Sequence, residues 1–181
     1  MHICRTRLCP KMSHQLSLYG SPIASTTTYK FLGVTIDDSL SWKGHVQNLK
    51  ISCLKKCELL KHISHKSWGA DMRSIILLYL SLIKPKLDYG VEAYGSASKR
   101  LLDSLEPVQN NSIRIATGCF RSSPIKSIRV ISGLKPLETY RNIKTLNYAT
   151  RVMTSPFNPI FERFQTEAIQ MDNDDPFDPK K

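Results

Sequence analysis

The stretch Tyr29-Lys30-Phe31-Leu32-Gly33-Val34-Thr35-Ile36-Asp37 marks the point where the chain changes from extended to helical spacing. Its aromatic and β-branched residues favour a strand. A shorter alternating run, Leu16-Ser17-Leu18-Tyr19, comes before it, and a turn at Gly20-Ser21-Pro22 separates the two. Two such runs predict a β-hairpin or a small sheet within residues 1–40. Gly33 inside the second run predicts a bulge or a close backbone approach.

Beyond Asp37 the apolar residues recur in steps of three and four. They are Val46, Leu49, Cys53, Leu54, Cys57, Leu60 and Ile63. This spacing places them on one face of a long helix. Ser39 or Ser41 is expected to cap that helix.

Four further helices are expected after it. Asp71 caps the second, which Pro85 breaks or kinks, and Ser98 caps the third. A short helix covers residues 124–131, and a last one ends near Met153. The third helix stops at Gly118. The predicted fold is α+β, mainly α: a β segment over 1–40, a five-helix bundle over 41–154, and a disordered acidic tail over 155–181.

The charge of the chain is strongly basic. It contains 26 Lys and Arg against 15 Asp and Glu. Five of the acids lie beyond residue 164, so residues 1–164 carry 24 basic and 10 acidic side chains, a net charge of +14. A cationic body favours a polyanionic partner, most simply nucleic acid. The alternative is a basic surface that only keeps the protein in solution.

Lysines recur along the polar side of the first helix. The candidate nucleic-acid-binding residues are Lys43, Lys50, Lys55, Lys56, Lys61 and Lys66. They extend over about six helical turns, a length that can follow several phosphates. The rings of Trp42, His45, His62 and Trp68 bracket them and offer platforms for stacked bases. The alternative is a solvated face with the tryptophans packed in the core.

The pair Asp37-Asp38 is the strongest candidate for a catalytic metal site. Polymerases hold two metal ions with carboxylates from neighbouring strands. The first 36 residues contain no Asp or Glu, so a third carboxylate is lacking upstream. The pair also lies where a helix begins, and carboxylates there bind free backbone N–H groups. We therefore expect a structural role and no catalytic residue in this chain.

Other chemistry is not indicated by the sequence. Cys53, Cys57, His62 and His65 have only four residues between the Cys pair and the His pair, too few for a zinc finger, and no metal site is expected. Phosphate loops and nucleophile elbows are missing, so no small-molecule substrate is expected. No apolar run is long enough to span a membrane. The N-terminal residues lack an apolar signal core, which predicts an intracellular, nuclear or cytoplasmic protein.

A succession of motifs resembles the reverse transcriptases of jockey-like LINE (non-LTR) retrotransposons. The motifs are residues 29–34 with Asp37, Leu40, Trp42 and His45; Ser67-Trp68-Gly69-Ala70-Asp71; Leu87-Asp88-Tyr89-Gly90; Tyr94-Gly95-Ser96-Ala97-Ser98; Leu105-Glu106-Pro107-Val108-Gln109-Asn110 with Arg114 and Gly118; and Phe120-Arg121-Ser122-Ser123-Pro124. Their fixed order over roughly residues 1–160 is more specific than any one motif.

The resemblance implies the C-terminal part of an RNA-directed DNA polymerase: the end of the palm, the thumb and a helical extension. Phe31, Leu32, Gly33 and Val34 would then form a primer-grip-like element. The lysines of the first helix would contact an RNA/DNA or DNA duplex. The family's Ala-Asp-Asp centre, which would hold Mg²⁺, is expected upstream of Met1, so this chain alone is expected to bind no cofactor and to be inactive.

A second hypothesis comes from the same resemblance. Separated from the palm, the β segment would expose apolar residues that once packed against it. The chain would then be a non-enzymatic helical protein-interaction module derived from a retroelement.

Overall fold

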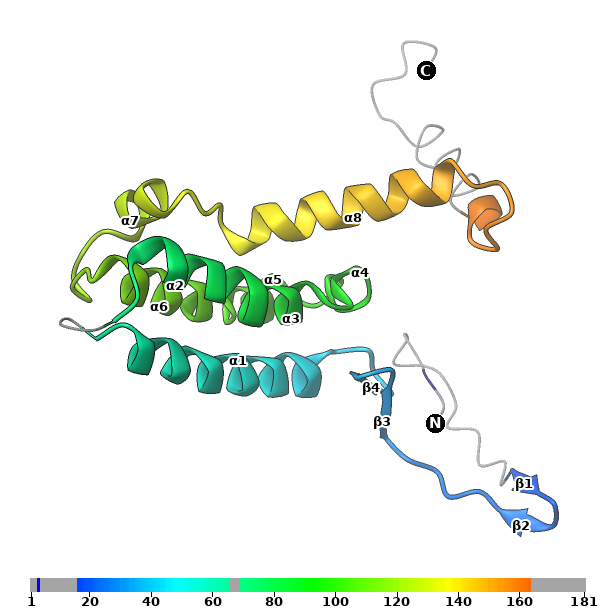
Figure 1. Cartoon of the computed structure of the whole chain (residues 1–181). Helices are drawn as coiled ribbons and strands as arrows, with labels where there is room; N and C mark the ends of the chain where they lie inside the picture. The colour runs from blue at the N-terminus through cyan, green and yellow to red at the C-terminus, as the bar shows by residue number, and fades with distance from the viewer. Residues whose placement is uncertain (1–2, 4–15, 66–68, 164–181) are drawn as a thin grey trace, which may run out of the picture.

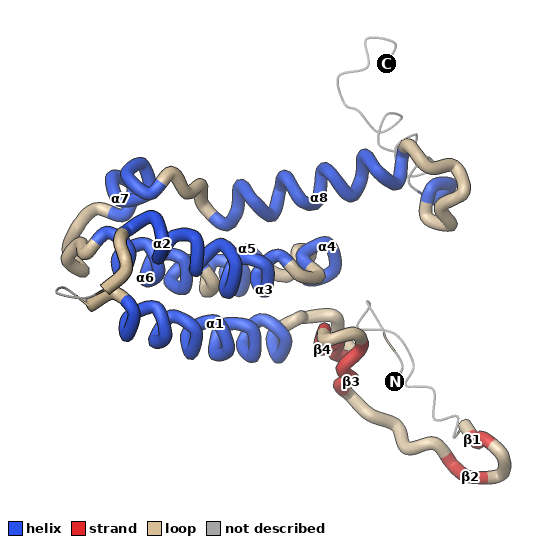
Figure 2. Tube along the Cα trace, viewed as in Figure 1, coloured by secondary structure: helices blue, strands red, loops and turns tan. Residues whose placement is uncertain are grey.

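The protein forms a helical body with a β arm at its N-terminal end. The computed structural model describes residue 3 and residues 16–65 and 69–163 (Figure 1). In the described residues, the strands are short and lie in the arm, and helices joined by loops follow them (Figure 2). The predicted α+β, mainly α class is confirmed. Lys66, Trp68 and residues 164–181 of the predicted tail lie outside the described residues.

The arm contains two separate hairpins. β1 (Ser17–Leu18) pairs with β2 (Ser21–Pro22), and β3 (Thr28–Phe31) pairs antiparallel with β4 (Val34–Asp37). Leu32 and Gly33 join β3 to β4 with φ values of 46° and 84°. Two consecutive positive φ angles are typical of two-residue hairpin turns whose twist matches that of the strands. The expected single strand over 29–36 is therefore wrong, because Gly33 turns the chain back instead of forming a bulge.

The long helix α1 (Lys43–Ile63) follows the second hairpin. Val46, Cys53 and Leu60 are fully buried on its inner face, as the apolar spacing predicts. This face packs against α6 (Glu106–Thr117) and against the helical run of residues 72–88. Neither Ser39 nor Ser41 is its N-cap residue; that position belongs to Trp42.

The second helical run contains three consecutive pieces: α2 (Met72–Leu78), the π-helical turn η1 (Tyr79–Ile83) and α3 (Lys84–Asp88). Asp71 caps it as predicted, since its carboxylate accepts hydrogen bonds from the N–H groups of Arg73 and Ser74. Pro85 does not break the run. Proline has no N–H and cannot donate the hydrogen bond of an α-helix to the residue four positions earlier. The wider π turn directly before Pro85 lets the helix continue without that bond.

The remaining helices are α4 (Val91–Tyr94), α5 (Lys99–Asp103), α6, α7 (Ile125–Ser132) and α8 (Leu137–Met153). The predicted third helix is divided into α5 and α6, and Pro107 lies in the first turn of α6, where its missing N–H costs nothing. Ser98 is the N-cap residue of α5, although its side chain makes no capping bond. Gly118 and Gly133 end α6 and α7 with φ values of 64° and 68°.

The helices form three layers. α1 lies on one side, α2 to α6 lie in the middle, and α7 and α8 lie on the other side (Figure 1). Lys84 links the middle layer to α8: its ammonium is 2.6 Å from both carboxylate oxygens of Asp88 and 4.0 Å from the ring centre of Tyr140. The body is thus held as one core, and the β3–β4 hairpin lies at the N-terminal end of α1.

Candidate nucleic-acid interface

The β3–β4 hairpin is fixed to the helical body at two points. The Tyr89 hydroxyl, at the end of α3, donates to the carbonyl of Leu32 at 2.5 Å. The N–H of Thr35 donates to Nδ1 of His45 on α1 at 3.3 Å. The hairpin also comes close at Gly90, where a Cβ atom would lie 3.0 Å from Val34. The sequence predicted a close approach at Gly33, but a Cβ atom there would lie 3.6 Å from Tyr89, an ordinary contact distance.

Asp37 organises the loop between the hairpin and α1. Its carboxylate accepts hydrogen bonds from the N–H groups of Ser41 and Trp42, both at 2.9 Å, and from the Ser39 hydroxyl at 2.6 Å. Partial burial alone would raise the pKa of Asp37, but these hydrogen bonds outweigh it and lower the pKa to about 2. The carboxylate therefore orders the chain ahead of the helix, in the structural role that the sequence predicts.

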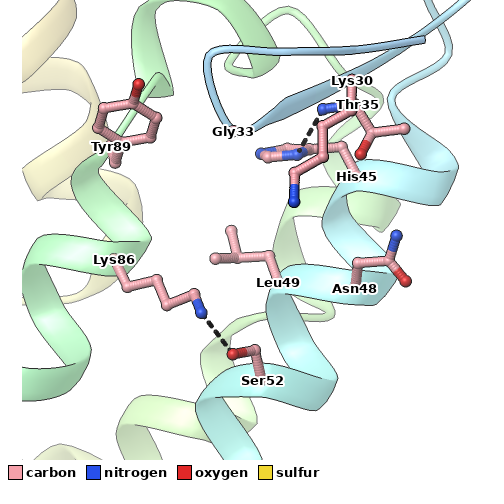
Figure 3. Close-up of a pocket in the computed structure, with 9 residues that line it drawn as sticks. All are labelled: Lys30, Gly33, Thr35, His45, Asn48, Leu49, Ser52, Lys86 and Tyr89. Atoms are coloured by element: carbon pink, nitrogen blue, oxygen red, sulfur yellow. Dashed lines mark hydrogen bonds between the residues drawn. The ribbon is translucent and has the colours of Figure 1, made fainter.

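A pocket opens where the hairpin meets α1 and α3 (Figure 3). We call it the hairpin pocket. Its volume is about 330 Å³, and it is lined by Lys30, Gly33, Thr35, His45, Asn48, Leu49, Ser52, Lys86 and Tyr89. Leu49 lies in its middle, with the hairpin, α1 and α3 on three sides (Figure 3). The pocket therefore combines the predicted primer-grip-like element with the first two long helical segments.

The hairpin pocket is electropositive. Lys30 and Lys86 enter it from different elements, and none of its lining residues is an acid. The Lys86 ammonium donates to the Ser52 hydroxyl at 2.5 Å. Burial lowers the pKa of His45, and its Nδ1 accepts a hydrogen bond, so the neutral ring carries its proton on Nε2. The pocket thus presents two ammonium groups and several neutral polar groups.

The six predicted lysines do not share one face of α1. At about 100° per residue, Lys43, Lys50 and Lys61 lie within about 20° of one direction. Lys55 lies about 120° from that direction, and Lys56 about 140° from it in the opposite sense. We call Lys43, Lys50 and Lys61 the far flank. Asn48, Ser52, Lys55 and Lys56 form the pocket flank, since Asn48 and Ser52 line the hairpin pocket.

The described lysines also differ in their partners. Lys56 donates to the carbonyl of Leu82 at 2.5 Å, and Lys61 forms an ion pair with Glu58 at 2.7 Å. Within residues 16–65 and 69–163, the ammonium groups of Lys43, Lys50 and Lys55 make no hydrogen bond or ion pair. Lys66 lies outside the described residues. The ammonium groups that remain open to an anion are therefore on both flanks of α1.

Two of the four predicted stacking platforms are buried. Trp42 is 6% exposed, and its Nε1 donates to the Ser96 hydroxyl at 3.0 Å. His45 is buried against Tyr94, with ring centres 5.2 Å apart. The prediction that these two rings stack on bases is wrong, because both pack at the junction between α1 and the middle layer. His62 is exposed, and Trp68 lies outside the described residues.

The cysteines of α1 are packed in the core. Cys53 and Cys57 are almost completely buried, and the thiol of Cys57 lies 3.3 Å from the Ser112 hydroxyl. Burial raises the pKa of Cys53 to about 11. In the part of the chain that the structure describes, no three His, Cys, Asp or Glu residues lie close enough together to hold a metal ion. Nor does any described helix have the length and apolar character needed to cross a membrane.

Lys30 and Lys86 are functional candidates that the sequence reasoning missed. The sequence pattern places Lys30 in a strand and assigns no role to Lys86. One sequence signal was available: Asn48, Ser52 and Lys55 recur at steps of four and three, which gives α1 a second polar row. The contact between this row and the hairpin depends on tertiary structure.

Comparison with known proteins gives several related sequences. The RNA-directed DNA polymerase from mobile element jockey of Drosophila melanogaster is 28% identical over 114 residues, which is 63% of this chain and 12% of the relative. The probable RNA-directed DNA polymerase from transposon BS of the same species is 23% identical over 104 residues, 58% of this chain and 12% of the relative. This chain is homologous to a segment of jockey-like reverse transcriptases.

A further relative extends the similarity to another element. It is a retrovirus-related Pol polyprotein from type-1 retrotransposable element R1 4 of Nasonia vitripennis, 23% identical over 141 residues, 76% of this chain and 35% of that protein. The matched part of this chain thus spans about an eighth of the length of the jockey and BS polymerases. No protein-family model and no solved structure matches it. The predicted resemblance is confirmed.

Proposed function

We propose that this chain is the part of a non-LTR retrotransposon reverse transcriptase that holds the template–primer duplex and does not supply the catalytic aspartates. The observation that carries the proposal is the hairpin pocket, where the primer-grip-like hairpin and α1 meet without an acidic residue. Basic side chains without neighbouring carboxylates attract phosphates. The full polymerase would act on RNA/DNA or DNA duplex, inside the cell, in the nucleus or the cytoplasm.

The anchoring of the hairpin supports this role. Positioning a nucleic-acid strand requires an element that is held at a fixed place. The hydrogen bonds between Tyr89 and Leu32 and between Thr35 and His45 tie the hairpin to the end of α3 and to α1. The exposed side chains of Phe31 and Leu32 remain available on the hairpin surface.

The hydrogen bonds of the Asp37 carboxylate support a structural role for this residue and not a catalytic one. Both carboxylate oxygens accept hydrogen bonds from the loop, and these bonds favour the ionised group in its structural position. Within the described residues, Asp37 also belongs to no group of three His, Cys, Asp or Glu side chains that could hold a metal ion. The Mg²⁺ ions of the full-length enzyme would therefore be held by other parts of the polymerase, and this chain would bind none.

Duplex binding by the purified 181-residue chain tests the proposal. A fluorescent RNA/DNA hybrid should bind, and the affinity should fall steeply between about 50 and 200 mM salt, because each phosphate contact releases counterions. Hybrid affinity that is independent of salt, or absent at low salt, would contradict the proposal. Primer extension with Mg²⁺ or Mn²⁺ should give no product, and measurable extension would refute the expected lack of catalysis.

The alternative function is a protein-interaction module, and one observation favours it. The β1–β2 hairpin exposes Leu16, Leu18, Tyr19 and Ile23, and Tyr19 is 99% exposed. Exposed apolar groups of this kind favour protein partners. A partner that stays bound after nuclease treatment, and is lost when Leu18 and Tyr19 are replaced by Ser, would support this function.

A further inference from the structure

We infer that the hairpin pocket binds one phosphate group of a nucleic-acid strand between Lys30 and Lys86. This inference rests on the proposed function and assigns a ligand to residues outside the predicted set. Lys30 lies on β3 and Lys86 on α3, so the two ammonium groups reach the pocket from separate elements (Figure 3). A phosphate between them would link the hairpin to the helical body.

The charge of the pocket suits a phosphate ester. Two lysines and no acid line it, and the one imidazole is kept neutral by burial. Asn48, Ser52 and Thr35 add neutral polar groups that donate hydrogen bonds to anionic oxygens. A carboxylate partner would normally balance two neighbouring lysines, so the unbalanced charge favours an external anion.

Neither Lys30 nor Lys86 forms an ion pair with a carboxylate of the described residues. The Lys86 ammonium donates to the neutral Ser52 hydroxyl, and the Lys30 ammonium makes no hydrogen bond or ion pair with the described residues. Lys84, only two residues away from Lys86, is instead buried and paired with Asp88. The two lysines of α3 therefore have separate roles: Lys84 stabilises the core, and Lys86 is open to a ligand.

The size of the pocket is sufficient. Its volume of about 330 Å³ corresponds to roughly eleven water molecules at about 30 Å³ each. A phosphate group with part of its sugar fits such a space. Leu49, which is only 6% exposed, adds a small apolar part to the lining of the pocket.

The position of the pocket also indicates the path that the bound nucleic-acid strand would take along α1. On α1, the polar row of Asn48 and Ser52 continues into Lys55 and Lys56 on the same flank. A strand with one phosphate between Lys30 and Lys86 would pass next to Lys55, which has no partner among the described residues. The pocket flank would therefore face the strand, and Lys43, Lys50 and Lys61 would face away from it.

Nuclear magnetic resonance of the ¹⁵N-labelled full chain tests this assignment. Inorganic phosphate is titrated at constant ionic strength against chloride, followed by adenosine 5′-monophosphate and by a DNA strand of eight thymidines. We expect the Gly33 backbone amide and the Asn48 side-chain amide to shift and to saturate. Gly118, which ends α6 with open space around it, should not shift. The thymidine strand should saturate the shifts at a lower concentration than the other two ligands.

The variants Lys30→Gln/Lys86→Gln and Lys43→Gln/Lys50→Gln form a matched pair, because each removes two positive charges. The first should abolish the shifts and the second should retain them, with circular dichroism showing equal helix content. The inference would be overturned if the Gly33 and Asn48 signals of the natural chain did not shift. It would also be overturned if they still shifted in Lys30→Gln/Lys86→Gln. Tighter binding of the mononucleotide than of the thymidine strand would instead indicate a nucleotide site and overturn the assignment to a strand.

Hybrid binding separates this inference from the proposed function. If the natural chain binds the RNA/DNA hybrid and Lys30→Gln/Lys86→Gln binds it equally well, the phosphate inference is wrong and the proposed function stands. If the natural chain binds no hybrid while phosphate still shifts Gly33 and Asn48, the duplex-binding proposal is wrong and the phosphate site stands.

Discussion

The two flanks of α1 carry similar numbers of lysines, but they have different surroundings, since the pocket flank lies beside the hairpin pocket. The far flank, with Lys43, Lys50 and Lys61, lies along the helix surface and includes an ion pair with Glu58. The pocket flank meets the β3–β4 hairpin and α3, where Lys30 and Lys86 add to the charge of Lys55. The proposed phosphate site therefore depends on the groups that the hairpin and α3 add beside α1, and not on the number of lysines along the helix.

Removing the two pocket lysines should give the largest effect on binding. Lys30→Gln/Lys86→Gln should weaken RNA/DNA hybrid binding roughly tenfold at about 0.1 M salt, the contribution of about one phosphate contact. The slope of log K against log salt should decrease by about one. Fluorescence anisotropy at several salt concentrations measures both values. A tenfold loss without a change in slope would show that the lysines act on folding and not on phosphate.

Displacing the hairpin should give the next largest effect. Gly90→Ala places a Cβ atom 3.0 Å from Val34, at a φ of 70° that costs about 1–2 kcal/mol for a residue with a side chain. Hybrid affinity should fall several-fold as the pocket opens. Gly118→Ala is the control, since its φ is 64° but open space surrounds it. Urea unfolding should show similar losses for both, and equal hybrid affinities would contradict the role of the hairpin.

Weakening the hydrogen bonds of the loop between the hairpin and α1 should have a smaller effect, measured as the free energy of unfolding. Asp37→Asn should lower the free energy of unfolding by roughly 1 kcal/mol at pH 7, as for the loss of a capping carboxylate. The pKa of Asp37 is lowered in the folded state, so its stabilisation is present above pH 3.8 and is lost as the pH falls towards 2. Urea unfolding at pH 7 and near pH 2 measures the difference.

The matched control for that loop is the exposed neighbour Asp38. Replacing Asp38 by Asn should leave the free energy of unfolding nearly unchanged at either pH. If Asp37→Asn and Asp38→Asn behaved alike, the hydrogen bonds of Asp37 to Ser41 and Trp42 would not account for the stability of this loop.

Removing charge from the far flank should give the smallest effect. Lys43→Gln/Lys50→Gln removes two charges, as does the pocket variant, but should weaken hybrid binding by only about twofold through the general field of the protein. Anisotropy under the same salt series measures it. A loss as large as that of Lys30→Gln/Lys86→Gln would restore the six predicted lysines as a single binding surface.

Local rules predicted much of the helical body from sequence. The apolar steps along α1, the Asp71 cap, and the end of α6 at Gly118 depend on neighbours within one or two turns, and the structure confirms them. The site was harder to predict, because it depends on contacts between distant residues. Trp42 and His45 are aromatic residues at the start of a basic helix, and only the packing of Ser96 and Tyr94 against them makes them core residues.

The π turn has a consequence for the orientation of every residue after it. Counted at about 100° per residue from Ile75, an uninterrupted α-helix would put Leu87 about 120° around the axis and Lys86 only about 20° from Ile75, facing the core. Because η1 accommodates one additional residue, Leu87 returns to within about 20° of Ile75 and Lys86 moves about 80° to the side. A one-residue phase shift within the helix thus places a leucine in the core and a lysine in the hairpin pocket.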